Sequence, residues 1–97
     1  MTQYVLIQLD PTDETMLAKY REHAGSAAAK HGGHQVGGGA GSETVEDNGL
    51  DARLSVLAKF PDANSARNWL ADPDLAPVHA MRRQGAKTVI QILTVRD

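Results

Sequence analysis

Apolar side chains recur at every second position in three stretches of the chain, residues 3–9, 52–60 and 87–95. This period matches a β-strand, in which successive side chains point to opposite faces. The first and last stretches are apolar on both faces, whereas the middle stretch has one apolar face and one mixed face. We therefore predict three strands, of which the first and last are covered on both sides.

Between residues 16 and 31 the apolar positions recur at spacings of three and four, the period of a helix that buries one face. Asp13 precedes this stretch and can accept hydrogen bonds from the free N–H groups of the first turn. Gly32 follows it and can adopt the left-handed conformation that closes a helix. These signals predict a helix lasting to about His31, whose small residues in its second half permit close approach to a sheet.

A second helical region follows the middle strand. Pro61 cannot continue a strand ladder, and Asp62 can cap a helix that runs to Ala71. Asp72-Pro73 repeats the signal of a capping residue followed by proline. We predict a further helical segment from there to about Gln84, with Pro77 starting its regular part.

The region between the first helix and the middle strand is rich in glycine and then in acidic residues. Four glycines within residues 34–41 predict a short, bent strand, and they would also let the backbone approach a ligand closely. Residues 42–51 are acidic and contain Asn48-Gly49, a strong turn signal. We expect this connection to be exposed.

The predicted order is strand, helix, strand, strand, helix, strand, the split βαβ arrangement of the ferredoxin-like α+β fold. Its four-stranded antiparallel sheet carries helices on one face only. The other face would still expose many apolar side chains, so a second copy of the chain is its expected cover. We predict one domain, residues 1–97, that forms a homodimer through this sheet face.

Composition narrows the range of partners. The 97 residues include 10 basic and 12 acidic side chains, a balance that does not favour nucleic-acid binding. The absence of cysteine excludes disulfides and thiolate metal sites. The N-terminal stretch lacks the basic region of a signal peptide, and no apolar run approaches the roughly 20 residues of a membrane helix. We expect a cytoplasmic protein with neither a nucleic-acid nor a membrane partner.

Several residues occur at spacings similar to those of one known family. They are Tyr4, Asp13, Tyr20, His31-Gly32-Gly33, Arg53, Phe60-Pro61, Ala66, Trp69, Asp72-Pro73 and Arg82. On these residues the chain resembles the small bacterial proteins of the domain of unknown function DUF1330, within the dimeric α+β barrel superfamily. The resemblance covers nearly the whole chain, with departures at Gln8, Gly37, Lys59 and Leu75. It implies a dimeric α+β barrel, and related barrels place ligands between the sheet and its helices.

Six residues are candidates for binding a small molecule: Tyr20, His23, Arg53, Trp69, His79 and Arg82. Arginine can hold a carboxylate through two parallel hydrogen bonds, aromatic rings can wall an apolar pocket, and a neutral imidazole can transfer protons. Each residue also has a structural interpretation, as a salt bridge or as core packing. His31 and His34 could converge on a metal, but no nearby acidic or cysteine residue completes a ligand set, so we expect no metal or cofactor.

The sequence leaves two functions open. The first is a homodimer that binds a small, partly apolar or anionic molecule between sheet and helices. The resemblance to related barrels implies turnover of the cofactor-independent oxygenase or isomerase kind for such a protein. The alternative is a non-catalytic dimeric module whose interior is filled by side chains.

Overall fold

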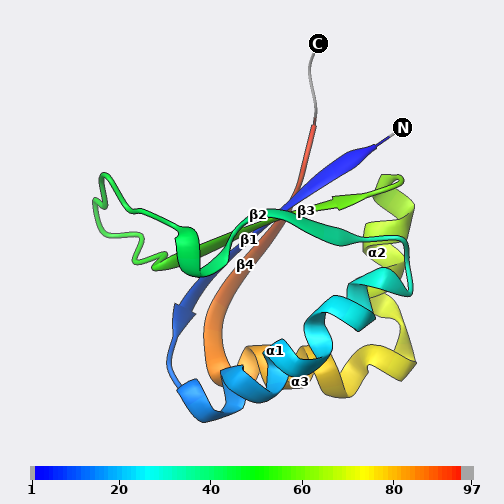
Figure 1. Ribbon diagram of the computed structural model, residues 1–97, viewed down its shortest axis with the longest axis horizontal. Coiled ribbons are helices and arrows are strands. Elements are labelled where there is room, and N and C mark those ends of the chain that lie inside the picture. The colour runs from blue at the N-terminus through cyan, green and yellow to red at the C-terminus, as the bar shows by residue number, and fades with distance from the viewer. Residues whose placement is uncertain (1, 95–97) are drawn as a thin grey trace.

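The protein folds into one four-stranded antiparallel sheet with its helices on one face (Figure 1). The computed structural model describes residues 2–94. The strands lie in the order β2-β3-β1-β4. Their bounds are β1 Gln3–Pro11, β2 His34–Gly38, β3 Leu54–Phe60 and β4 Ala86–Leu93. The predicted end of the last strand at Val95 lies outside the described residues.

Three α-helices and two short 3-10 turns connect the strands. Their bounds are α1 Glu14–Ala29, η1 Gly39–Gly41, α2 Ala63–Ala71, η2 Pro73–Leu75 and α3 Ala76–Gly85. This order confirms the predicted ferredoxin-like α+β fold. Within residues 2–94, no helix has both the length and the apolar character that crossing a bilayer requires.

The predicted helix caps are present. The Asp13 carboxylate accepts a hydrogen bond from the backbone N–H of Met16 at 3.1 Å, and the Asp62 carboxylate accepts one from that of Ser65 at 2.7 Å. Gly32 has the left-handed φ of 78° that closes the first helix. Asp72 caps the short η2 turn, and the regular helix α3 follows with Pro77 in its first turn, as predicted.

The centre of the sheet is β1, which pairs with β3 on one side and β4 on the other. Its residue Ile7 lies opposite Val56 and Ile90, and all three side chains point toward the helices. The core between sheet and helices contains Val5, Ile7, Leu9, Leu17, Tyr20, Phe60 and Trp69 among its buried residues. The helix-facing side of β1 therefore forms the sheet side of the hydrophobic core.

Helices α1 and α3 approach each other most closely at Gly85. A Cβ atom at this position would stand 2.7 Å from the backbone nitrogen of Leu17, which is closer than a Cβ atom packs against another atom in folded proteins. The Gly85 carbonyl also accepts hydrogen bonds from the backbone N–H groups of Thr12 and Asp13. This contact fixes the start of α1 against the end of α3.

The edge strand β2 is bent, as its glycines predict. Its pairing with β3 shifts register between Gln35 and Gly37, and Gly38 has a positive φ of 83°. A side chain at Gly38 would collide with the carbonyl group of Ser55. The connection over residues 42–53 is largely exposed and extends away from the sheet (Figure 1).

The face of the sheet away from the helices carries apolar side chains that the single chain leaves uncovered. They are Tyr4, Leu6, Leu57, Val89 and Leu93, at strand positions that alternate with the core residues. We call this set the outer apolar face. Leu6 lies directly opposite Leu57, and Val89 is 51% exposed.

Candidate functional site

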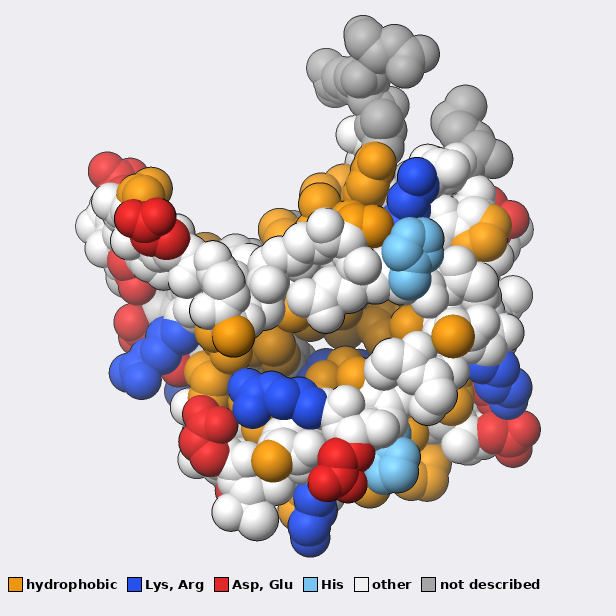
Figure 2. Space-filling model, viewed as in Figure 1, with side chains coloured by type: hydrophobic (Ala, Val, Ile, Leu, Met, Phe, Trp, Pro, Cys, Tyr) orange, Lys and Arg blue, Asp and Glu red, His pale blue; other side chains and the backbone are white. Residues whose placement is uncertain are grey.

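A cleft of about 640 Å³ lies between α1 and the helix-facing side of the sheet. Its walls are mainly apolar and come from β1, β3 and α1. They include Ile7, Leu9, Leu17, Tyr20, Ala24, Gly25, Leu54 and Val56. Figure 2 shows this hollow, with hydrophobic side chains inside it and basic and histidine side chains on the surrounding surface.

The cleft continues toward the aromatic part of the core. A further hollow of about 90 Å³ shares Ile7, Tyr20 and Val56 with the larger one and reaches Phe60 and Trp69. We call this deeper part the aromatic end. The cleft as a whole thus runs along α1 from the bent edge strand into the interior.

Gly25 helps to keep the cleft open. It lies within α1 and lines both parts of the cleft, and a Cβ atom built on it would meet nothing within 4 Å. Its neighbours Ala24 and Ala28 also have small side chains. The sequence predicts close approach of this half of the helix to the sheet, but Gly25 borders open space.

Trp69 is the largest side chain at the aromatic end. Its ring lies 5.4 Å from that of Phe60 and packs edge-on against that of His79 at 5.1 Å, measured between ring centroids. The indole Nε1 is buried and has no hydrogen-bond partner within residues 2–94. A buried donor without a partner is costly, so this atom is one that a ligand could satisfy.

His79 and Arg82 form a buried pair behind Trp69. The Arg82 Nη1 donates to His79 Nδ1 at 2.6 Å, and His79 Nε2 lies 2.8 Å from the backbone carbonyl oxygen of Trp69. A guanidinium group can only donate and a carbonyl oxygen can only accept. His79 is therefore a neutral imidazole with its proton on Nε2, and both of its ring nitrogens are occupied.

The electrostatic surroundings of His79 agree with this protonation state. Burial lowers the pKa of His79 below its ordinary value, and the nearby positive charges of Arg82 and Arg83 lower it further. The hydrogen bond to the Trp69 carbonyl and the charge of Asp72 act in the opposite direction. The net effect keeps the imidazole uncharged.

Arg82 is a buried cation without an acidic partner. Its side chain is 1% exposed, and no carboxylate within residues 2–94 forms an ion pair with it. The guanidinium carbon lies 5.9 Å from the ring centroids of both Tyr20 and Trp69. Burial lowers the pKa of Arg82, an effect that its interaction with Tyr20 opposes.

The aromatic contacts compensate only part of the cost of burying Arg82. Removing an ion from water still costs several kcal/mol after the protein relaxes, whereas a desolvated cation–π contact contributes about 2 kcal/mol. The Nε atom of Arg82 also has no hydrogen-bond partner among the described residues. The guanidinium is therefore held in place by His79, Tyr20 and Trp69 without being neutralised.

Four of the six predicted site residues come together: Tyr20, Trp69, His79 and Arg82. The other two do not join them. His23 is exposed on α1 and does not line the cleft. Arg53 precedes β3, has an exposed side chain and lies 3.5 Å from the Asp10 carboxylate. The structure therefore brings four of the six candidates together and places His23 and Arg53 elsewhere.

His31 and His34 lie in different surroundings. The His31 Nε2 lies 2.8 Å from the Asp72 carboxylate, which also receives the Lys30 ammonium at 2.7 Å. The hydrogen bond from Lys30, which has the larger effect, and the one with His31 hold the pKa of Asp72 well below its usual range. His34 is exposed, and no group of three or more metal-ligating side chains occurs within residues 2–94.

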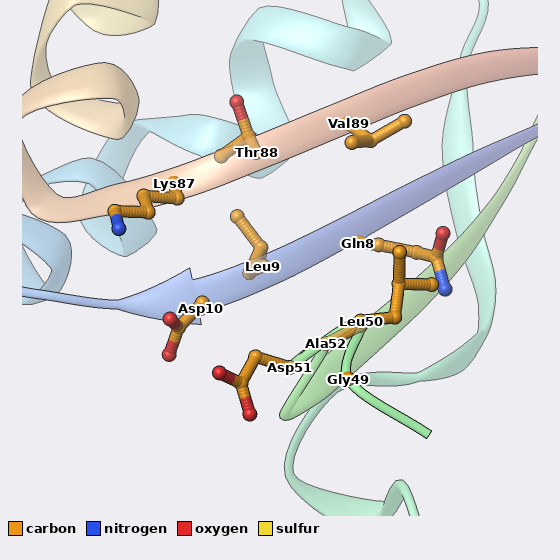
Figure 3. Close-up of a pocket in the computed structure, with 10 residues that line it drawn as sticks. All are labelled: Gln8, Leu9, Asp10, Gly49, Leu50, Asp51, Ala52, Lys87, Thr88 and Val89. Carbon is orange, nitrogen blue, oxygen red and sulfur yellow. The ribbon is translucent and has the colours of Figure 1, made fainter. Parts of the chain in front are cut away.

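A second hollow, of about 250 Å³, lies beside the acidic connection (Figure 3). Residues 49–52 of the connection border it together with parts of β1 and β4, among them Asp10 and Lys87. Asp51 and Lys87 are exposed. Because its charges face solvent and no unpartnered buried polar atom lies among its lining residues, the cleft along α1 is the better candidate site.

Sequence reasoning missed Gly25, Phe60 and Gln35 as residues that line the cleft. A glycine inside a predicted helix can indicate a site, because glycine lowers helix stability and nothing in the local sequence explains its presence. Phe60 gives no such signal, since a buried aromatic residue at the end of a strand is common in any core. Gln35 lies on an irregular strand whose side-chain directions the sequence pattern does not define.

Comparisons with known proteins identify the family and the fold. The family model described as "Domain of unknown function (DUF1330)" matches residues 2–95. A search of curated protein sequences finds no significant match.

Three similar solved structures illustrate the fold. A protein of unknown function from Rhodopseudomonas palustris has a TM-score of 0.73 at 17% identity, over 99% of this chain and 83% of that one. SnoaB, a cofactor-independent oxygenase from Streptomyces nogalater, has a TM-score of 0.62 at 16% identity, over 99% and 92%. A dimeric ferredoxin-like protein of unknown function from Jannaschia has a TM-score of 0.66 at 14% identity, over 98% and 100%.

Proposed function

The chain belongs to the DUF1330 family, and we propose that it is a homodimer that binds a small, largely apolar molecule in the cleft along α1. The observation that carries the proposal is the cleft itself. Its volume of about 640 Å³ falls within the range of about 300–1,000 Å³ typical of small-molecule sites. Its mainly apolar walls and few polar groups are also typical of such sites.

The cleft favours this function over the non-catalytic alternative. A purely structural module would fill the space between sheet and helices with side chains, because empty apolar volume lowers stability. Here Gly25 borders open space, although a larger side chain would fit there without a clash. The open cleft, which Gly25 lines as an exposed residue, is therefore what favours ligand binding over a filled interior.

Cofactor-independent oxygenation of the bound molecule is a second candidate function. The likeness in fold to SnoaB, an oxygenase of this kind, favours it. His79 is an unsuitable proton acceptor for such a reaction, since both of its ring nitrogens are hydrogen-bonded. Oxygen consumption in the presence of a bound aromatic ligand, measured with an electrode, would test this activity.

Binding can be tested with two flat probes of equal size, naphthoate and naphthamide. Trp69 is the single tryptophan of the chain, so one indole N–H signal in a proton–nitrogen correlation spectrum reports on the aromatic end. We expect at least one probe to shift this signal in a saturable way. Gly25→Leu should weaken the binding more than tenfold, because it places a side chain in the cleft.

Ser26→Leu provides the matched control. Ser26 is the next residue of α1, is exposed and does not line the cleft, so the same new side chain there should leave the affinity unchanged. Equal affinities of the two variants and the unaltered protein would contradict binding in the cleft. Circular dichroism would check that both variants remain folded.

A further inference from the structure

The charged side chains that belong to the cleft are all basic within residues 2–94. Arg21 lines its outer part, and no aspartate or glutamate lines either part. Arg82 lies beyond the aromatic end, against the rings of Tyr20 and Trp69. An occupant of the cleft therefore meets the positive charge of Arg21 at the outer end, whereas Arg82 lines neither part and lies behind the Tyr20 and Trp69 rings at the other end.

The aromatic end also has hydrogen-bond donors without acceptors. Trp69 Nε1 and Arg82 Nε are both buried and unpartnered among the described residues, and neither atom can accept a hydrogen bond. Buried polar groups are almost always satisfied in folded proteins. The free indole N–H of Trp69 lies beside a guanidinium group that has a free N–H of its own, and this combination favours an acceptor that carries negative charge.

We propose that the cleft binds a planar organic anion whose carboxylate or phenolate oxygen lies at the aromatic end. This inference rests on the proposed function and adds the chemical class of the ligand. The flat apolar part lies along α1 beside Ala24 and Gly25, and the anionic oxygen accepts a hydrogen bond from Trp69 Nε1. The positive charge of Arg82 stabilises this oxygen across the aromatic rings.

The burial of Arg82 makes this electrostatic contribution effective. Charges in a protein interior interact more strongly than charges in water, because the surrounding medium screens them less. Arg21 differs in this respect, since its side chain is 53% exposed and already lies near Glu14. Arg82 is therefore the residue that determines preference for an anion, and its neighbour Arg83, which is exposed and lines neither part of the cleft, is a suitable control.

The test compares naphthoate with its uncharged analogue naphthamide by titration calorimetry at about pH 8, where the carboxylate is ionised. We expect naphthoate to bind the unaltered protein at least tenfold more tightly. Arg82→Met should reduce this preference to less than twofold while leaving the affinity for naphthamide nearly unchanged. Arg83→Met, the same substitution at an exposed position outside the cleft, should leave the preference as it is.

A second variant keeps the test decisive if Arg82→Met fails to fold. Trp69→Phe retains an aromatic ring and removes the indole N–H, so it should weaken naphthoate binding severalfold and naphthamide binding much less. A loss of the preference in Arg21→Gln alone would overturn the inference, because it would place the anion at the outer end.

The two proposals fail in different ways. Equal affinities of the two probes for the unaltered protein, or tighter binding of naphthamide, would overturn the anion inference and leave the binding cleft intact. Binding of neither probe would overturn both proposals.

Discussion

At the scale of the residue, the burial of His79 links the candidate site to the stability of the fold. The imidazole accepts from Arg82 and donates to the Trp69 carbonyl, and only its neutral form can make both hydrogen bonds. Protonation would place two adjacent positive charges in the interior. His79 is therefore expected to make folding sensitive to mild acid.

We predict that stability falls as the pH drops below about 6.5, the ordinary pKa of histidine. The unfolded chain takes up a proton on His79 near this pH, whereas the folded chain, whose pKa is lowered by burial, does so only at lower pH. Folding is therefore opposed by acid over this interval. The urea midpoint, measured between about pH 7.5 and 5.5, should decrease toward the acidic end.

His79→Gln tests the assignment of this effect. A glutamine amide can accept from Arg82 and donate to the Trp69 carbonyl without titrating, so the variant should lose most of the pH dependence in this interval. His23→Gln is the control, since His23 is exposed. A pH profile that is unchanged by His79→Gln but flattened by His23→Gln would show that His79 is not the group responsible.

The placement of Arg53 shows that a prediction from single residues lacks information about how the elements pack. Period-two alternation puts Arg53 on the face opposite to Leu54 and Val56, and the structure agrees, because these two residues pack toward the helices. Its grouping with Arg82 rested on chemical type alone. The sequence identifies the right kinds of residue, but the burial of Arg82 depends on how α3 lies against α1, which no local pattern records.

At the scale of the element, two glycines near helix contacts have opposite roles. Gly85 is required by the fold, because a Cβ atom there would collide with the backbone of α1. Gly25 is not required, because a Cβ atom there meets open space. Glycine within a helix lowers stability by about 1 kcal/mol relative to alanine, so the fold would gain from its replacement.

We predict that Gly25→Ala raises the free energy of unfolding by about 0.5–1 kcal/mol, because α1 loses a poor helix former without any new clash. Urea denaturation followed by circular dichroism measures this change. Gly85→Ala is the contrasting variant and should destabilise the protein by at least about 1 kcal/mol, as overpacking does. Loss of stability in Gly25→Ala would show that this glycine serves packing.

The elements themselves are largely predictable from the sequence. Asp13 and Asp62 start helices because their carboxylates accept hydrogen bonds from free backbone N–H groups. This interaction is local, so the residue type is enough to predict it. The start of α3 is indicated by Pro77 in its first turn, although no side chain caps it. The cleft, by contrast, cannot be predicted from the sequence, because its width depends on the distance between α1 and the sheet.

At the scale of the whole molecule, the outer apolar face is the feature that a single chain leaves unexplained. Its five side chains come from the three strands β1, β3 and β4, with Leu6 opposite Leu57 and Tyr4 opposite Leu93. Contiguous apolar surface of this kind marks an interaction site. In the homodimer proposed above, a second copy of this chain would cover the face.

We predict that the protein sediments as a dimer at micromolar concentration and that Leu57→Lys converts it to a monomer. In a two-fold symmetric interface one substitution introduces two charges, which lose their hydration on association. The cleft lies on the opposite side of the sheet and is built from one chain, so the monomeric variant should retain binding of the naphthalene probes.

Val45→Lys is the matched control, because Val45 is 90% exposed on the acidic connection and lies outside the outer apolar face. It should leave the sedimentation coefficient unchanged. A monomeric unaltered protein, or a Leu57→Lys variant that remains dimeric, would mean that the outer apolar face is not the interface. Dissociation by Val45→Lys alone would instead place the contact on the connection, which would leave the outer face still in need of a partner.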